Sequence, residues 1–355
     1  MSISHQSATC FDSAQSAPVP GILSPALGKE RRIAGTQHFT LEERIAYLKQ
    51  YGCHCMSYSA LQPGMQFFDM PGKGYIPYMQ KWGARFALAD PVCEKDDREA
   101  LIRAFIEGNG NCGFVQVSQP VAEMIHEKFG FYATRFGTES VVDLTDWNLK
   151  GKKKQVLRTS LNQARKQGVV VMEKYDESRD VALSEAWLKT RKVKKKEIIF
   201  LIRPMSMDYK VGTRKFFAYH NDELVGFIFF DPIYSGDRII GYVPNISRFS
   251  QSFRQGIFYT LMLHAMEVFQ EEGVAQIHLG LSPMATGEGD QGYESPIVKK
   301  IIRLLYQYGN DLYNFRGIYF SKSRFCGEEY GTFCCHRSSV PLIKFLTLFR
   351  ISNVI

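Results

Sequence analysis

The chain has 355 residues, of which 45% are hydrophobic and 23% are charged, and its net charge is +8. This length favours one large domain or two of medium size, and the composition is that of a folded globular protein. No uninterrupted apolar run approaches the roughly 18–20 residues of a membrane-spanning helix, which predicts a cytoplasmic protein. Residues 1–36 are rich in Ser, Ala and Pro and do not have the charged and apolar blocks of a secretory signal, so we expect a disordered leader.

The eight cysteines do not show the regular spacing of a disulfide framework, which agrees with a reducing compartment. Two clusters, Cys53-His54-Cys55 and Cys334-Cys335-His336, invite a zinc interpretation. Structural zinc sites usually place two or more residues between paired ligands, and neither cluster does. We therefore expect reduced, mostly buried thiols and no metal site.

The N-terminal part of the chain, residues 37–150, is predicted to interleave short strands with helices. A capping box at Thr40 favours a helix that begins at the next residue. The elements expected after it are strands over 66–69, 74–79 and 85–88, a helix over 96–107, a buried strand over 112–117, a helix over 121–129 and a strand over 139–143.

Residues 151–355 repeat this pattern more clearly. The expected elements are a basic helix over 156–167, a strand over 168–174, a helix over 180–190, antiparallel strands over 215–220, 224–231 and 238–243, a long helix over 255–272 and a buried strand over 276–280. Three strands, a helix and a strand resemble the core of the Gcn5-related acetyltransferase fold, and the first part fits that order more loosely. We therefore predict an α+β protein of two such domains in tandem, each a mixed, mostly antiparallel sheet flanked by helices, with a boundary near residue 150.

Positive charge is concentrated between Lys150 and Lys196, a stretch that contains fifteen Lys or Arg and five Asp or Glu. Such a block is expected on a surface that binds a polyanion, such as tRNA, an anionic lipid surface or a phosphorylated substrate. A solvated helix face is the alternative. Because two separate runs contribute, we favour a binding surface, and the candidate tRNA contacts are Lys152, Lys153, Lys154, Arg158, Arg165, Lys194, Lys195 and Lys196.

Three stretches carry a more specific resemblance. They are Tyr75-Ile76-Pro77-Tyr78 with Ala87-Leu88-Ala89-Asp90-Pro91-Val92, then Val142-Asp143-Leu144 continuing to Arg165, and then Ile277-His278-Leu279-Gly280-Leu281-Ser282-Pro283-Met284 with Lys322-Ser323-Arg324-Phe325. In this order, over roughly residues 40–350, they resemble the C-terminal catalytic region of phosphatidylglycerol lysyltransferases, the multiple peptide resistance factor family.

The resemblance implies an enzyme that moves an aminoacyl group from tRNA to a hydroxyl acceptor, with aminoacyl-tRNA as co-substrate and no cofactor. Membrane members of the family carry a multi-helix domain ahead of this region, and we expect this chain to be a soluble member without it. A small-molecule acceptor is then favoured. A polar lipid such as phosphatidylglycerol, reached by peripheral contact with the inner face of an anionic membrane, stays open.

Two departures from the family pattern bear on the substrates. Where the family has Asp-Leu-Met-Arg, this chain has Asn245-Ile246-Ser247-Arg248. If that carboxylate recognises a cationic amino acid, its replacement by an amide predicts a neutral donor such as alanine, glycine or serine. The family's later Trp-Glu-Pro-Arg-Tyr-like segment is replaced by residues 328–333, so the acceptor is not identified.

In acetyltransferase-like folds the reaction takes place where two central strands diverge, and we expect the strand ending at Pro244 and the strand 277–280 to flank that gap. The candidate catalytic residues are Asn245, Arg248 and Asp231, although Asp231 before a proline is equally typical of a turn. Glu294, beside the glycine-rich loop 287–292, is expected on a mobile lid. His264 and His278 are expected to be core residues, and no general base is assigned. The candidate substrate-binding residues are Asp90, Tyr242, Gly280, Ser282, Glu294, Lys322 and Arg324.

Other functions remain open at this point. Residues 248–256 contain one glycine, so the pyrophosphate-binding loop of coenzyme A-dependent relatives is not evident. An acyl-coenzyme A-dependent N-acyltransferase is nevertheless one alternative, and a non-catalytic protein that binds RNA or an anionic membrane is another. The apolar segment 342–355 either rests on such a membrane or packs against the second domain.

Overall fold

The computed structural model describes residues 38–190, 196–205, 209–250, 253, 256–286, 293–309 and 313–354. The strands are β1 (Gln66–Met70), β2 (Gly74–Lys81), β3 (Ala84–Leu88), β4 (Val92–Cys93), β5 (Cys112–Ser118), β6 (Tyr132–Asp143), β7 (Val170–Glu173), β8 (Arg214–His220), β9 (Glu223–Ser235), β10 (Arg238–Phe249), β11 (Gln276–Pro283) and β12 (Glu328–His336). The helices are α1 (Leu41–Tyr51), α2 (Arg98–Gly108), α3 (Gln119–Phe129), α4 (Gln155–Lys166), α5 (Asp180–Lys189), α6 (Ile257–Glu271), α7 (Pro296–Tyr308), α8 (Phe315–Ser323) and α9 (Leu342–Ile351).

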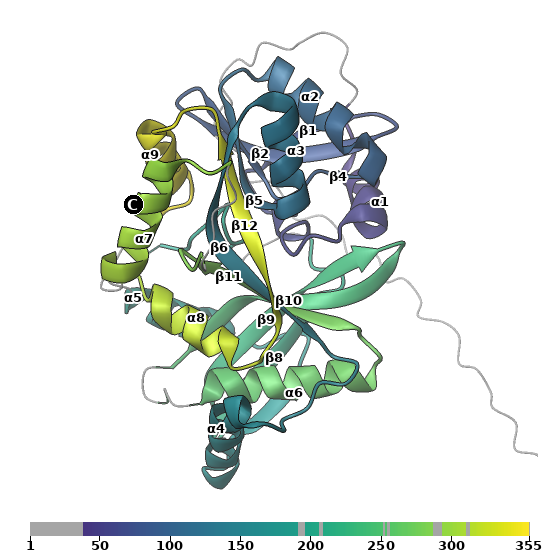
Figure 1. Ribbon diagram of the computed structural model, residues 1–355. Coiled ribbons are helices and arrows are strands. Elements are labelled where there is room, and N and C mark those ends of the chain that lie inside the picture. The colour runs from purple at the N-terminus through teal and green to yellow at the C-terminus, as the bar shows by residue number, and fades with distance from the viewer. Residues whose placement is uncertain are drawn as a thin grey trace, which may run out of the picture. The chain divides into compact units, whose positions relative to one another are not determined.

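These elements form one twelve-stranded mixed sheet, in the order β1-β2-β3-β5-β12-β6-β11-β10-β9-β8-β7, with β4 paired to β2 (Figure 1). The pairs β3–β5 and β10–β11 are parallel, and the other pairs are antiparallel. The predicted α+β class is confirmed, as is the order of three strands, a helix and a strand from β8 to β11. The predicted capping box at Thr40 is also present.

The C-terminal strand β12 lies inside the N-terminal half of the sheet. It pairs antiparallel with β5 on one edge and with β6 on the other. Its last five residues, 332–336, are buried or nearly so, because helix α3 also packs against it. The boundary near residue 150 stays a prediction, but the sheet of residues 37–150 is completed by a strand from the end of the chain.

Strands β10 and β11 separate soon after they meet. Their parallel pairing comprises Gly241 with Gln276 and Tyr242 with Ile277. Beyond this point β10 continues along β9 as far as Phe249, with a register shift between Pro244 and Ile246. The expectation that this strand ends at Pro244 is therefore wrong, since the proline falls at an irregularity rather than at a terminus. The expected gap between the two strands is present.

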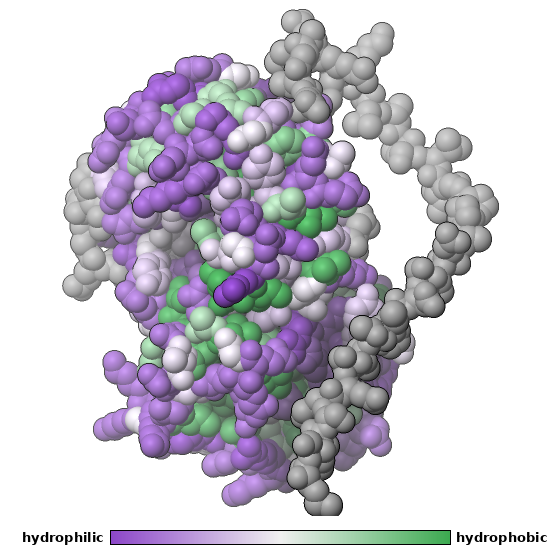
Figure 2. Space-filling model, turned by 90° about the vertical axis from the view of Figure 1, so that its right-hand side faces the viewer, coloured by the Kyte–Doolittle hydropathy of each residue, from purple (hydrophilic) through white to green (hydrophobic). Residues whose placement is uncertain are grey.

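Three of the buried clusters account for most of the described interior. One joins α6 to β8, β9, β10 and β11, because α6 is apolar on most of its surface and buries eight residues. A second lies between the N-terminal strands and helices α2 and α3. A third draws on both halves, since Cys55, Leu88, Val243, Cys334 and Leu348 all belong to it. On the face shown in Figure 2, strongly apolar side chains gather around the middle, with hydrophilic ones above and below.

We predict that residues 37–150 do not fold when expressed alone. Without β12, the inner edges of β5 and β6 have no partner, and unpaired backbone groups in a buried sheet are costly. A heteronuclear NMR spectrum of this fragment should show the narrow amide dispersion of an unfolded chain, whereas the full chain should show wide dispersion. A well-dispersed spectrum of the fragment would contradict the prediction.

Candidate active site

The segment 53–62 contributes to two polar groups beside the gap, one with Asn245 of β10 and one with His278 of β11. It is held in place by Gln62, whose Oε1 accepts from the backbone N–H of Phe200 at 2.7 Å and whose Nε2 donates to the Phe200 carbonyl at 3.2 Å. These bonds fix the short helix Ser59–Leu61 against the second half of the chain. Cys55 and Ser59 are thereby presented to residues far away in the sequence.

The first polar group surrounds Asp231, which is fully buried on β9. Its carboxylate forms an ion pair with Arg203, whose Nη2 lies 2.6 Å from Oδ1, and accepts from the Nε of the same guanidinium at 2.8 Å. Asn245 Nδ2 donates to Asp231 Oδ2 at 2.8 Å and also to Ser59 Oγ, and Ser59 Oγ donates to Asp231 at 3.3 Å. These bonds occupy the Asp231 carboxylate and fix the orientation of the Asn245 amide. They leave Asn245 Oδ1 buried and, among the described residues, without a hydrogen-bond partner.

Arg248 extends from β10 towards α5. Its Nε donates to Ser184 Oγ at 3.1 Å, its Nη2 lies 3.1 Å from Glu197 Oε1, and its guanidinium stacks 4.3 Å from the Trp187 ring centroid. A cavity of about 450 Å³ opens beside these partners. Its lining includes Asp180, Ser184, Glu197, Arg203, Lys215 and Phe229. A cavity with both carboxylates and cations next to Arg248 has the polarity that a zwitterionic or ammonium-bearing ligand requires.

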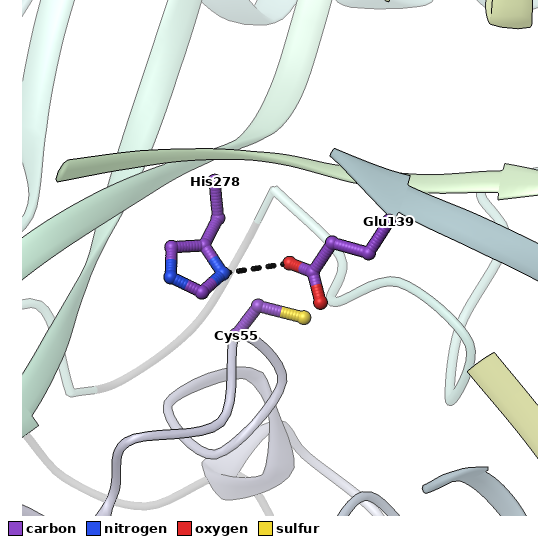
Figure 3. Close-up of side chains that lie close together, drawn as sticks. All are labelled: Cys55, Glu139 and His278. Atoms are coloured by element: carbon purple, nitrogen blue, oxygen red, sulfur yellow. Dashed lines mark hydrogen bonds and ion pairs between the residues drawn. The ribbon is translucent and has the colours of Figure 1, made fainter. Parts of the chain in front are cut away.

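The second polar group contains Cys55, Glu139 of β6 and His278 of β11, which point towards one another (Figure 3). His278 Nδ1 lies 2.8 Å from Glu139 Oε1. Burial alone would raise the pKa of Glu139, but the hydrogen bond and the charge of His278 outweigh it and lower this pKa to about 2. Burial, reinforced by the charge of Glu139, raises the pKa of the Cys55 thiol well above its usual range, so the thiol stays neutral.

Lys322 of α8 closes this second group. Its Nζ donates to the carbonyls of Gly280 at 2.9 Å and Leu281 at 2.7 Å. Gly280 has a φ of +70° at a register irregularity of β11, and a Cβ at this position would lie 3.6 Å from Val243 and 3.7 Å from Lys322 Nζ. Burial lowers the pKa of Lys322 to about 8, although Glu139 and Cys55 oppose the shift. The predicted site residues Gly280 and Lys322 therefore lie together, beside the gap.

Within the described residues, one set of side chains places metal-ligating atoms together, namely Cys55, Glu139 and His278, whose atoms lie within 4.8 Å of one another. Thiolate, carboxylate and imidazole are ligands that zinc accepts. However, the Lys322 ammonium faces the same carboxylate and would repel a cation. Cys53 and His54 do not belong to this set. The site therefore favours an organic substrate over a metal ion.

Other predicted substrate-binding residues lie elsewhere. Tyr242 is on the α6 side of the sheet, where its ring stacks 4.4 Å from that of Phe269. Asp90 accepts from the backbone N–H and the hydroxyl of Ser118 and so orients the start of α3. Ser282 is buried in the β6–β11 pairing. These three side chains are engaged in structure, and their binding roles stay predictions.

Glu294 and Arg324 also have structural partners. Glu294 is buried, pairs with Lys299 at 2.6 Å and accepts from the backbone N–H of Arg135. A position this well anchored does not match the expected mobile lid, while residues 287–292 lie outside the described residues. The Arg324 guanidinium lies 4.2 Å from the Phe320 ring centroid at the end of α8.

The basic block begins at η3 (Lys152–Lys154) and continues through α4. Lys152, Lys153 and Arg165 are exposed. Lys154 donates to the carbonyl of Asn148, and Arg158 donates to those of Leu149 and Gly151, so both side chains also hold the loop before α4. Lys196 is exposed, while Lys194 and Lys195 lie outside the described residues.

Several residues of the two groups were not predicted from the sequence. Arg203, Ser59, Cys55 and Glu139 lie in unrelated segments, and no local pattern links them. His278 was expected to be a core residue. The sequence offered an indication for Arg203, which follows the apolar run 198–202, where a charged side chain needs a partner.

Comparison with known proteins adds the family. The family model described as phosphatidylglycerol lysyltransferase, C-terminal, matches residues 45–336. The chain belongs to this family. The resemblance carried by the three sequence stretches is confirmed, and the matched range includes Cys55, Glu139, Asn245, His278 and Lys322.

Relatives of this lysyltransferase-family chain are distant. An uncharacterised protein of Corynebacterium glutamicum is 24% identical over 322 residues, and the phosphatidylglycerol lysyltransferase of Staphylococcus aureus strain MRSA252 is 22% identical over 301 residues. These matches cover 86% and 80% of this chain but 40% and 34% of those proteins. The structure of L-PGS from Bacillus licheniformis has a TM-score of 0.74 at 21% identity and covers 88% of this chain and 97% of its own, which shows a shared fold. Within the described ranges of this family member, no helix has both the length and the apolar character needed to cross a membrane.

We predict that Arg203→Met destabilises the protein by about 3–5 kcal/mol, because it leaves the Asp231 carboxylate buried without its counter-ion. Arg103→Met is the matched control, since Arg103 pairs with Glu99 at the exposed surface and its loss should cost less than about 1 kcal/mol. Urea denaturation followed by circular dichroism measures both. Equal losses for the two variants would show that the buried pair has no special role.

Proposed function

We propose that the protein is an aminoacyltransferase that moves an aminoacyl group from tRNA to a hydroxyl-bearing acceptor. The observation that carries the proposal is the gap between β10 and β11, flanked by two buried polar atoms, Asn245 Oδ1 and His278 Nε2, that have no partner among the described residues. Buried polar atoms in native proteins are almost always paired, so atoms of this kind favour a site completed by a ligand.

The chemistry of such a transfer matches what the gap provides. Aminoacyl-tRNA is an activated ester, so transfer requires positioning, removal of a proton from the acceptor hydroxyl and stabilisation of the oxyanion. Past Tyr242 and Ile277, no further pairs join β10 and β11, and this is where the proposal places the reacting carbonyl. The Lys322 ammonium lies beside this gap and adds a positive charge.

The exposed part of the basic block supports tRNA as the carrier. Lys152, Lys153 and Arg165 lie on one short stretch of η3 and α4, where they would meet the phosphates of an RNA strand. Lysyl transfer to a lipid is the activity named for the Staphylococcus aureus relative, and this chain spans 34% of that protein. For this chain, the exposed basic residues and membership of the family together support tRNA as the donor of the aminoacyl group.

Asn245 supports a neutral amino acid as the donor. Its amide replaces the family's carboxylate, and the nearest carboxylate, Asp231, is already paired with Arg203. A cationic side chain that entered here would find no uncompensated negative charge at this group. Alanine, glycine or serine would not need one.

The proposal allows two classes of acceptor, a small molecule and a polar lipid such as phosphatidylglycerol. The first turn of α9 favours contact with a lipid surface, because Leu342 and Ile343 are exposed there, and Ile343 is 80% exposed. The opposite face of α9 packs into the protein, since Leu348 and Ile351 belong to the cluster shared by both halves. Peripheral membrane contact through this turn is thus compatible with the fold.

The proposal is tested by incubating the protein with a panel of radiolabelled aminoacyl-tRNAs, together with phosphatidylglycerol vesicles or with glycerol. We expect label from a neutral aminoacyl-tRNA in a ribonuclease-resistant product. Extraction into organic solvent separates a lipid product from a soluble one. Absence of transfer from every aminoacyl-tRNA to either acceptor would overturn the proposal.

A filter-binding assay with labelled tRNA at several salt concentrations tests the basic surface. Lys152→Ala with Lys153→Ala should weaken tRNA binding by about tenfold and reduce its salt dependence, because fewer phosphates are neutralised. Lys95→Ala with Lys128→Ala removes two exposed lysines outside the block and is the matched control. Equal tRNA affinity for both double variants would place the binding surface elsewhere.

We predict that Asn245→Asp shifts donor preference towards lysyl-tRNA by about tenfold or more, as expected for a new charged hydrogen bond to the ammonium. The variant also brings a second carboxylate next to Asp231, so its free energy of unfolding should fall. Competition between lysyl-tRNA and alanyl-tRNA measures the preference. Asn245→Ala is the control, and a lysyl preference in that variant too would exclude the charge as the cause.

A further inference from the structure

His278 occupies a position that the proposed reaction would use. It is the first residue of β11 beyond the last pair with β10, and the irregularity of β11 at Leu279 and Gly280 follows it directly. Its neighbours Ile277 and Leu279 point into the α6 core, whereas the imidazole points towards Cys55 and Glu139 on the other side. His278 therefore lies where the pairing of β10 and β11 ends, and its side chain faces the segment 53–62.

The hydrogen bond of the ring determines which nitrogen is free. Glu139 Oε1 lies 2.8 Å from Nδ1, and a carboxylate can only accept, so Nδ1 carries the proton. Figure 3 shows that Nε2 lies on the edge of the ring away from Glu139. Nε2 is buried and has no partner among the described residues. In its neutral form, a ring held in this way presents a bare Nε2 lone pair, as in carboxylate–histidine pairs that accept protons.

The other titratable groups around the ring are less suited to accept a proton. The Cys55 thiol is neutral, as described above, and Lys322 donates to two carbonyls. His54 is engaged through its Nδ1, which accepts from the backbone N–H of Met56 at 3.0 Å. In the neighbouring group, the Asp231 carboxylate is occupied by Arg203 and Asn245.

We propose that His278 is the general base of the transfer and that Glu139 is its positioning residue. The inference rests on the proposed function and assigns a residue to its proton-transfer step. Nε2 takes the proton of the acceptor hydroxyl as the acceptor oxygen bonds to the aminoacyl carbonyl carbon. The bond between this carbon and the ribose oxygen of tRNA then breaks, and the proton passes from His278 to that ribose oxygen. Atoms and charge balance without a further reactant.

His278→Asn tests the base. The asparagine amide still donates to Glu139 but offers no basic nitrogen, so kcat should fall by about 10²-fold or more while the KM for aminoacyl-tRNA stays within about threefold. The substrates are the labelled aminoacyl-tRNA that the wild type uses best and the acceptor found with it. His264→Asn, on α6 and packed against Phe216, is the matched histidine control and should retain the rate. Circular dichroism of each variant confirms folding.

The pH profile separates a base from a structural residue. In the wild type, kcat should rise with pH along a limb that is absent in His278→Asn. Glu139→Gln keeps a hydrogen-bond acceptor but removes the negative charge beside the ring, so the position of this limb on the pH axis should change. A residue that only supports the fold would lower the rate without moving the limb.

Nitrogen NMR of ¹⁵N-histidine-labelled protein provides a readout that does not need turnover. At neutral pH the resonances absent from His278→Asn should show a protonated Nδ1 and an unprotonated Nε2. A protonated Nε2 with a bare Nδ1 would overturn the inference. So would an active wild type whose His278→Asn variant keeps its rate and pH profile, and in that case the proposed function stands. A wild type without transfer from any aminoacyl-tRNA would remove both.

Discussion

The buried carboxylate of Asp231 sets the arrangement of the site. A charge removed from water requires a counter-charge and hydrogen-bond donors at fixed positions. Arg203, from the segment before β8, provides the charge. Asn245 of β10 and Ser59 of the N-terminal part of the chain provide hydrogen-bond donors. Pairing the Asp231 carboxylate with its counter-ion and hydrogen-bond donors therefore requires that distant segments of the chain meet at the gap. The orientation of the Asn245 amide, which is central to the proposed donor specificity, is a consequence of that requirement.

The segment 53–62 connects the two polar groups. Cys55 faces Glu139 and His278, and Ser59 faces Asp231 and Asn245, so one short stretch of backbone contacts both sides of the gap. Its anchoring by Gln62 to Phe200 is a pair of backbone-directed bonds and does not depend on side-chain charge. A substrate that entered between β10 and β11 would thus meet groups whose separation is set by a rigid connection. Such preorganisation lowers the reorganisation that a transfer reaction needs.

Local sequence pattern was sufficient for most elements and insufficient for their assembly. The apolar surface of α6 and the continuous apolar runs of β8 and β9 report burial directly, so these elements were predicted to within a few residues. The role of β12 was not predicted, because a strand records which of its faces is buried but not which strands lie beside it. Asn245, Arg248, Gly280 and Lys322 were identified through the family resemblance, and the structure brings Gly280 and Lys322 together. Arg203 and Glu139 were missed because their partners are distant in sequence, and charge complementarity leaves no periodic trace.

The position of β12 also has a consequence for synthesis of the protein. Thr134 of β6 bonds to His336 at the end of β12, and 202 residues separate them. During translation, β5 and β6 are made long before β12, the strand that lies between them. Until then, one edge of each strand has no hydrogen-bonding partner. Open edges of this kind attract other strands, and pairings between such distant segments form slowly. The chain is therefore expected to complete this sheet only after residues 328–336 have been made, and chaperones that shield strand edges would assist it in that interval.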